Sequence, residues 1–385
     1  MADITYNHKN NSTAAIRVAC AIVFLIFTFC YLYFYQCDLL GAQQHVLSGG
    51  QTTYSRIIGA IIITGVLYLL HLGVFAITKL TKHAHALTYF PSLLVLCILT
   101  SPSDNFDQHF SLSFWTWFAP LLLIVYVIIV YSSMQWQPYV SEKSGTGLFS
   151  GMSWVNMMTM AFMFMFVGIY SNGNDVLHYR LHVERCLKNK DYESALKVGE
   201  RSLATDSSLV MLRASALARS NMLAEHLFEY PLVGGSASLL PNGTSVRCVS
   251  HDPGDIYRPV GAIPKNKMTV EEYLKTIKIT HQTRGAYRDY LLCSYLLDKK
   301  IDKFAYELRN YYKVDSATVL PKHYREALTL YKHQHASKYE GFVDDVCEAD
   351  YEDLLAMRKK YHNEQERQTR LRDAYGKTYW YYYLY

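Results

Sequence analysis

Five apolar stretches of the sequence contain no Asp, Glu, Lys or Arg, and they constrain the fold more than any other feature. They cover residues 18–35, 57–78, 86–100, 114–131 and 152–170. A helix needs roughly 17 to 25 apolar residues to cross about 30 Å of hydrocarbon. The stretches therefore predict an all-α chain whose residues 1–170 form a transmembrane domain of five helices in a lipid bilayer.

The charged residues divide the chain at about residue 171. The first 170 residues contain eleven Asp, Glu, Lys and Arg, whereas the remaining 215 contain sixty. The mean hydropathy of -0.01 conceals this division. Such a distribution excludes a single soluble globule, a disordered chain and a fibrous repeat. We expect residues 171–385 to form a separate, soluble domain.

The basic residues of the short loops predict the orientation, because Lys and Arg are retained on the cytoplasmic side. Five of them fall on one side of the predicted spans (Lys9, Arg17, Lys79, Lys82 and Lys143), and only Arg56 falls on the other. The N-terminus is therefore predicted to be cytoplasmic. Five spans place residues 171–385 outside, in the periplasm of a bacterium. The third stretch is short and carries Pro91, so a re-entrant hairpin is an alternative that leaves four spans and a cytoplasmic domain.

His71 is the only readily titratable side chain well inside a predicted span. A proton or ion pathway normally needs several intramembrane ionisable groups. A single histidine is more typical of a hydrogen bond to a neighbouring helix, and transport is disfavoured.

The second half shows a recurring helical pattern. Apolar residues from Val176 to Leu187 follow the three-and-four spacing of an amphipathic helix, and residues 191–206 suit the second helix of a tetratricopeptide-like pair. Another helix pair is expected over 209–230. Tyr287 to Cys293 repeats Tyr179 to Cys186 about 108 residues later, with the two cysteines in equivalent core positions. The pattern favours a soluble α-solenoid; an irregular helical domain is the alternative.

A long irregular insertion is expected at residues 231–264. It holds five of the ten prolines and five glycines, which prevent a continuous helix. Long loops of this kind are usually functional or disordered. Leu239, Leu240 and Pro241 are candidates to pin the loop or to bind a partner, and a plain insertion is the alternative.

Three segments carry a resemblance to known proteins. They are residues 320–328 (Leu-Pro-Lys-His-Tyr-Arg-Glu-Ala-Leu), 290–298 (Tyr-Leu-Leu-Cys-Ser-Tyr-Leu-Leu-Asp) and 89–94 (Tyr-Phe-Pro-Ser-Leu-Leu). The chain resembles a group of uncharacterised bacterial multi-pass membrane proteins with tetratricopeptide-like helical C-terminal domains. The resemblance implies this architecture and a location in the bacterial inner membrane, but no activity.

Residue types that carry chemistry are sparse. His178 and His182 stand four apart without a recognisable third ligand, and the acidic run from Asp344 to Asp353 lacks the spacing of a calcium loop. We predict no metal site and no cofactor. The second half has 32 basic and 28 acidic residues without a dominant basic patch, so nucleic-acid binding is disfavoured.

Two further hypotheses concern loops and the C-terminus. Asp38, Asp104 and Asp107 lie on predicted outside loops, which admits a membrane-embedded, glycosyltransferase-like enzyme as an alternative. The aromatic tail includes Trp380 and Tyr382, which suit a partner, the bilayer interface or packing on the chain's own helices. The leading prediction is a non-enzymatic membrane protein whose periplasmic domain is a scaffold for protein partners in envelope assembly or transport.

Overall fold

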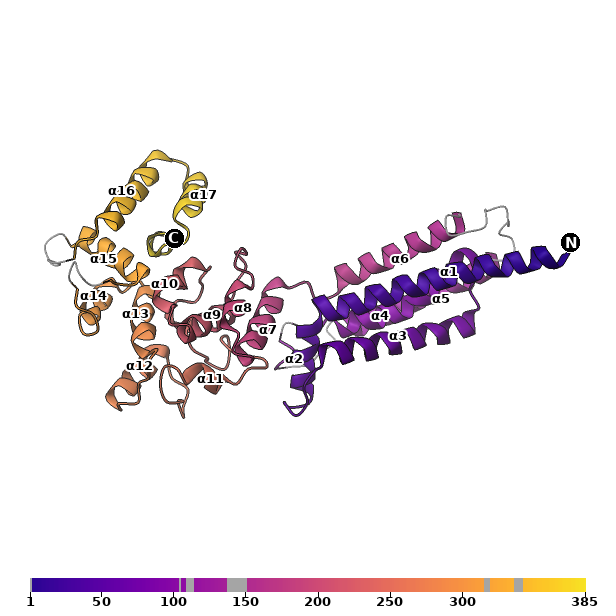
Figure 1. Ribbon diagram of the computed structural model, residues 1–385, viewed down its shortest axis with the longest axis horizontal. Helices are drawn as coiled ribbons and strands as arrows, with labels where there is room; N and C mark the ends of the chain where they lie inside the picture. Colours follow the sequence, from indigo (N-terminus) through magenta and orange to yellow (C-terminus); the bar gives the residue numbers. More distant parts are fainter. Residues whose placement is uncertain (1, 104, 109–113, 137–150, 315–318, 336–341) are drawn as a thin grey trace. The chain divides into compact units, whose positions relative to one another are not determined.

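The computed structural model describes residues 2–103, 105–108, 114–136, 151–314, 319–335 and 342–385, and these form helices and no strand. The chain divides into two compact units, Met1–Asn174 and Asp175–Tyr385 (Figure 1). Each unit has its own apolar core.

The first unit is a bundle of long apolar helices that lie side by side in Figure 1. Its elements are α1 (Ala2–Cys30), the π-helix η1 (Tyr31–Tyr35), α2 (Cys37–Leu47), α3 (Arg56–Thr78), the 3₁₀ helix η2 (Lys82–Tyr89), α4 (Phe90–Leu99), α5 (Trp115–Trp136) and α6 (Gly151–Tyr170). Four helical stretches in the described part are long and apolar enough to cross a membrane: Ala14–Tyr35, Arg56–Thr78, Trp115–Trp136 and Gly151–Tyr170. The protein is therefore a membrane protein by the length and composition of these helices.

The third predicted span is composite rather than one α-helix. Pro91 lies in the first turn of α4, where its missing N–H costs nothing, but it cannot extend the hydrogen-bonding pattern of a preceding α-helix. The chain before it forms η2 instead. The backbone N–H of Ala86 donates to Asn156 Oδ1 on α6 at 2.8 Å, so a side chain supplies an acceptor for this tighter segment.

Contacts along its length show how the segment η2–α4 runs through the bundle. Ala86 contacts Asn156 of α6, Cys97 Sγ is 3.8 Å from Val167 O, and Asn172 N donates to Thr100 O just beyond both helices. The segment is thus parallel to α6 from end to end. It does not fold back on itself, as a re-entrant hairpin would.

The second unit is built from shorter helices around α9. They are α7 (Asp175–Lys188), α8 (Tyr192–Lys197), α9 (Ser207–Arg219), α10 (Leu223–His226), η4 (Leu227–Glu229), η5 (Gly235–Ser238), α11 (Pro253–Tyr257), α12 (Val270–Ile279), α13 (Tyr287–Leu297), α14 (Ile301–Leu308), α15 (Lys322–Gln334), α16 (Asp345–Lys360), α17 (Glu364–Tyr375) and α18 (Tyr379–Leu384). Helix α9 is buried on every side from Ser208 to Ala218. Asp206 caps it by accepting from the N–H of Leu209 at 2.7 Å.

The expected repeats differ from the observed helices. Of residues 191–206, only Tyr192–Lys197 are helical, because the chain becomes extended at Val198 and Gly199 takes a φ of +61°. Over residues 209–230 one long helix is followed by two short ones. Cys186 and Cys293 are both buried in the core, as predicted.

Candidate functional site

The irregular segment 231–264 is held in place by buried side chains. Leu239, Leu240 and Val246 are buried in the core of the second unit and hold the segment against it. Two short helices, η5 and α11, interrupt the segment. It is an ordered part of the domain, and its exposed side is available to build a site.

Glu184 of α7 anchors the middle of this segment. Its buried carboxylate accepts hydrogen bonds from the backbone N–H groups of Val249, Ser250 and His251, at 2.7 to 3.2 Å, and from Ser250 Oγ at 3.0 Å. Burial raises the pKa of Glu184, and the hydrogen bonds from Ser250 and Val249 act in the opposite direction. No local pattern indicates this role, because the donors lie 65 to 67 positions away along the chain.

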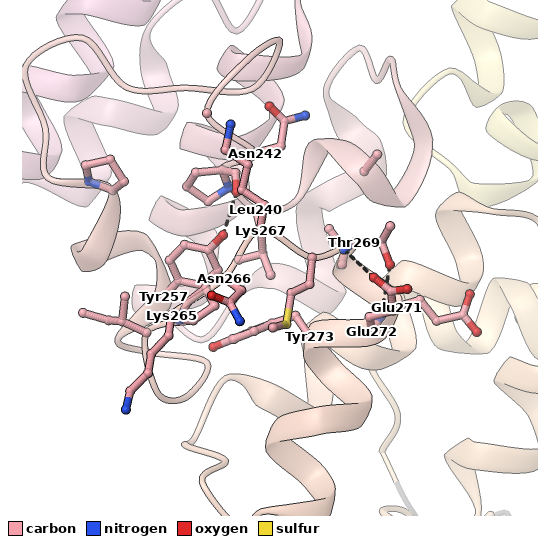
Figure 2. Close-up of a pocket in the computed structure, with 18 of the residues that line it drawn as sticks. Leu240, Asn242, Tyr257, Lys265, Asn266, Lys267, Thr269, Glu271, Glu272 and Tyr273 are labelled. Atoms are coloured by element: carbon pink, nitrogen blue, oxygen red, sulfur yellow. Dashed lines mark hydrogen bonds between the residues drawn. The ribbon is translucent and has the colours of Figure 1, made fainter.

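A pocket of about 850 Å³ opens along this segment and the start of α12. We call it the loop pocket, and Figure 2 shows 18 of its lining residues. Its walls come from Ser236, Ala237, Leu240, Pro241, Asn242, Gly243, Arg247, Pro253, Gly254, Tyr257 and residues 263–273. Its volume is within the range of about 300 to 1,000 Å³ that is usual for ligand sites. Leu240 and Pro241, proposed from sequence as partner-binding residues, therefore line a cavity, whereas Leu239 does not.

Two tyrosines give the loop pocket a fixed aromatic lining. Tyr257 Oη donates to Pro241 O at 2.6 Å, and Tyr273 Oη donates to Ala262 O at 2.9 Å. The two rings meet edge to face, with centroids 5.1 Å apart. Because both hydroxyls are engaged by the loop backbone, the rings are held in place. Tyr273 is buried, so Tyr257 supplies the accessible aromatic surface of the pocket.

The charges around the loop pocket are unevenly neutralised. Glu271 pairs with Lys275 and Lys300, which lower its pKa to about 2, and Glu272 accepts from Thr269 N in the capping box of α12. Both acidic groups are thus already engaged. Lys265 and Lys267, by contrast, have no ion pair with any residue that the structure describes, and both are exposed.

The membrane unit contains a buried histidine pair. His71 Nδ1 lies 3.0 Å from Thr88 Oγ1, which confirms the predicted hydrogen bond to a neighbouring segment, and the ring of Tyr89 stacks on His71 at 3.6 Å. His85 is also buried, 5.7 Å from His71 between ring centroids. It was missed from sequence because the predicted third span began at residue 86.

The other titratable candidates are engaged in local structure. His182 Nδ1 lies 3.4 Å from Arg185, and Asp344 caps α16 by accepting from the N–H of Cys347. Glu348 of the acidic run pairs with Lys332 and His333. No cluster of three or more His, Cys, Asp or Glu suited to a metal ion occurs among the described residues.

The aspartates of the transferase hypothesis gain no supporting geometry. Asp38 lies in the first turn of α2, where Cys37 Sγ is 3.6 Å from its Oδ1, and Asp107 lies in the turn after residue 104. Asp104 is outside the described residues. Nothing observed brings these carboxylates together.

The aromatic tail packs on its own domain, which corrects its assignment as a partner-binding element. Trp380 is only 2% exposed, and its Nε1 donates to Glu326 O at 2.6 Å. Tyr382 Oη donates to Leu297 O at 2.8 Å, and its ring packs against Phe228. Of the alternatives weighed, packing on the chain's own helices is the one observed, because core contacts satisfy both polar tips.

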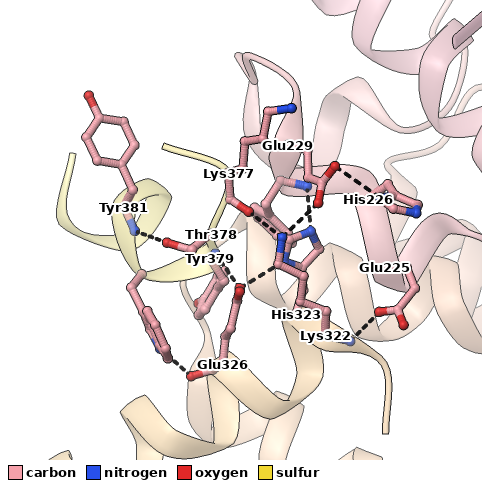
Figure 3. A network of polar contacts seen from close by, with 12 residues as sticks. Glu225, His226, Glu229, Lys322, His323, Glu326, Lys377, Thr378, Tyr379 and Tyr381 are labelled. Carbon is pink, nitrogen blue, oxygen red and sulfur yellow. Dashed lines mark hydrogen bonds and ion pairs between the residues drawn. The ribbon is translucent and has the colours of Figure 1, made fainter. Parts of the chain in front are cut away.

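A polar network fixes the tail, and Figure 3 shows its members converging from three segments. Buried Glu326 accepts from His323 Nδ1 at 2.8 Å and from the N–H of Tyr379 at 2.7 Å. His323 Nε2 accepts from the N–H of Phe228 at 3.3 Å. Both ring nitrogens of His323 are thus engaged inside the network. The pair resembles a catalytic dyad in composition, but its geometry makes it structural.

Comparison with known proteins adds one match. No curated protein and no solved structure matches the chain. A family of unknown function, DUF6057, matches residues 264–385, a region that includes one wall of the loop pocket and the residues His323, Glu326 and Tyr379 of the tail network.

Proposed function

We propose that this chain is a five-span protein of the bacterial plasma membrane. Its second unit is a tetratricopeptide-like helical domain on the outer side of that membrane. This domain is a scaffold that binds a polypeptide partner through the loop pocket. The observation that carries the proposal is the pocket itself. Its lining is held by tyrosine hydroxyls and its loop by Glu184, so it exists without a ligand. A preformed site loses less conformational entropy on binding.

Five crossings are supported by the length of the composite segment. Eight residues of 3₁₀ helix and ten of α-helix together rise about 31 Å, close to the roughly 30 Å of a hydrocarbon core. The segment is also parallel to α6 from Ala86 to Thr100. Non-α backbone at membrane depth is tolerated where protein covers it, and Ala86, Thr88 and Tyr89 are buried. An odd number of crossings puts the two ends of the bundle's chain on opposite sides.

The orientation is supported by the basic residues. Arg17 stacks on Phe75 near the end of α3, and Lys79 caps that helix. Arg56 begins α3 at its opposite end, where its guanidinium stacks on Tyr33. With Lys9, Lys82 and Lys143 counted by sequence, the excess of positive charge favours a cytoplasmic N-terminus.

Reporter fusions after Tyr385 test the topology. Alkaline phosphatase is active only in the periplasm, so we expect a phosphatase fused after Tyr385 to be active. Green fluorescent protein that is exported unfolded does not fluoresce, so we expect the same fusion with this protein to be dark. A fusion after Lys79 is the internal control and should show the reverse. An inactive phosphatase and a fluorescent protein after Tyr385 would contradict five crossings.

Site-specific photocrosslinking in native membranes tests the loop pocket. A benzoylphenylalanine in place of Asn266, which lines the pocket, should give a discrete adduct. The same probe in place of Tyr306, which is 77% exposed on α14 and outside the pocket, is the matched control. Adding Ile263→Trp, which fills the pocket, should remove the adduct. Adducts that are the same at both positions, or that survive the filling, would contradict binding in the pocket.

A further inference from the structure

The loop pocket combines an apolar lining with a basic rim. Tyr257, Ile263 and Met268 supply its accessible apolar surface, while buried Tyr273 holds the loop backbone through its hydroxyl. Lys265 and Lys267 alternate with Asn266 along one exposed wall. In Figure 2, Lys265, Asn266 and Lys267 lie on one loop segment next to Tyr257.

The distribution of charge selects the sign of the ligand. Glu271 and Glu272 at the other end are satisfied by Lys275, Lys300 and the capping box, so they contribute little free negative potential. Lys265 and Lys267 have no such partner in the described part of the chain. An anionic group that reaches this wall gains two attractions and displaces no existing ion pair.

A compact phosphate is a poor match for the same site. The N-terminus of α12 opens on the pocket and is the natural place for a phosphate, but the capping box already satisfies Glu272 N and Thr269 N. The basic wall is a stretch of non-helical chain, Ile263 to Met268, rather than a concave nest of N–H groups. An extended ligand uses such a wall better than a small ion does.

We infer that the loop pocket recognises an extended peptide segment in which apolar and acidic side chains alternate, an inference that rests on the proposed function and specifies its partner. Successive side chains of an extended chain point in opposite directions. One set can therefore pack on Tyr257, Ile263 and Met268 while the other places its carboxylates beside Lys265 and Lys267.

Fluorescence anisotropy with the full-length protein in phosphatidylcholine nanodiscs tests this. The probe is a labelled hexapeptide, Leu-Asp-Phe-Glu-Leu-Asp, with Leu-Gln-Phe-Gln-Leu-Gln and Leu-Lys-Phe-Lys-Leu-Lys as matched neutral and basic peptides. The acidic peptide should bind at least about tenfold more tightly than the basic one, and more weakly at high salt. The double variant K265E/K267E should weaken its binding about tenfold and favour the basic peptide. The control K359E/K360E, which changes two exposed lysines of α16, should leave binding unchanged.

The outcomes separate this inference from the proposed function. Equal binding of the three peptides, lost in Asn266→Trp but unaffected by K265E/K267E, would overturn the acidic preference and leave peptide binding in place. No binding of any peptide, together with photocrosslinking that is not specific to the pocket, would overturn both. Phosphatidylglycerol vesicles are a further arm: binding to them that depends on Lys265 and Lys267, without peptide binding, would assign the wall to lipid and overturn the inference.

Discussion

The carboxylate of Glu326 accepts a hydrogen bond of 2.7 Å from the backbone N–H of Tyr379, a residue 53 positions further along the chain. The same carboxylate receives His323 Nδ1, and the backbone carbonyl of Glu326 receives Trp380 Nε1. One residue of α15 thus fixes the beginning of α18. Two of these hydrogen bonds, from Tyr379 and Trp380, join the last helix to α15.

Replacing Glu326 with Ala should detach the tail and destabilise the second unit. Removing one member of a buried hydrogen-bonded pair costs about 3 kcal/mol, since His323 and the Tyr379 N–H lose their acceptor. We expect faster proteolysis near residue 376 and a lower midpoint of thermal unfolding. Glu352→Gln, an exposed change on α16, is the control. Equal cleavage rates in the two variants would show that the network does not hold the tail.

Glu184→Gln should loosen the segment that carries the loop pocket. The amide replaces one acceptor oxygen with a donor that faces backbone N–H groups, at a cost of about 2 kcal/mol. Hydrogen exchange followed by mass spectrometry should speed up in peptides covering residues 249–251. The exposed change Glu193→Gln breaks only a surface pair with Lys197 and should leave this exchange alone. Unchanged protection in Glu184→Gln would mean that the loop is held elsewhere.

His251 should make the stability of the second unit depend on pH. Burial lowers the pKa of His251, Arg219 and Lys188 lower it further, and Asp255 and Asp252 oppose them. The unfolded state therefore binds the proton more readily, so stability is full above about pH 6.5 and falls as the pH drops below it towards the folded pKa. Thermal unfolding at pH 7.5 and 5.5 measures the effect. In His251→Phe the difference between the two midpoints should shrink, and an unchanged difference would assign the dependence to other groups.

Gly199→Ala should destabilise the turn after α8. Gly199 has a φ of +61°, and an added Cβ would lie 2.8 Å from the ring of Tyr179. Strain and the displaced ring together should cost about 1 to 3 kcal/mol. Gly285→Ala, where a Cβ meets nothing within 4 Å, is the matched control in the same unit. Denaturant unfolding compares them, and equal midpoints would show that the ring moves without cost.

Asn156→Leu should weaken the packing of η2 against α6. The Ala86 N–H loses its 2.8 Å acceptor inside the bundle, and polar contacts between membrane helices contribute about 1 kcal/mol each. The detergent-solubilised variant should unfold at a lower temperature than Met158→Leu, a change at an exposed position of the same helix. A variant as stable as this control would mean that η2 finds another acceptor.

Aromatic residues illustrate how far sequence reasoning reached for the candidate site. The proline-rich stretch was identified as the functional region from composition, and the loop pocket is there. The role of the aromatic tail is harder to predict, because Trp and Tyr occur both in partner-binding surfaces and in cores. Trp380 is buried because its Nε1 donates to Glu326 O and its ring packs against Tyr351. Glu184 carries no local signal, since its partners lie 65 to 67 positions away in sequence. His323 has one partner three positions away, Glu326, but its other partner, Phe228, is 95 positions away.

The sequence by itself determined the all-helical class and the division between a charge-poor and a charged half. A run of uncharged apolar residues that is long enough to cross the hydrocarbon core has few stable structures other than a membrane-spanning helix. Capping residues such as Asp206 and Thr269 likewise act within one turn, so helix starts can be read locally.

Tertiary structure decided what local pattern leaves open. Pro91 divides the third apolar stretch into η2 and α4. The course of this stretch parallel to α6 depends on the hydrogen bond from Ala86 to Asn156, 70 positions further along the chain. The loop pocket exists because Tyr257 and Tyr273 each find a carbonyl in the loop, and because Glu184 gathers three consecutive N–H groups. Such hydrogen bonds form between groups brought together by the packing of the whole unit, and their partners are 11 to 70 positions apart without a local pattern that pairs them.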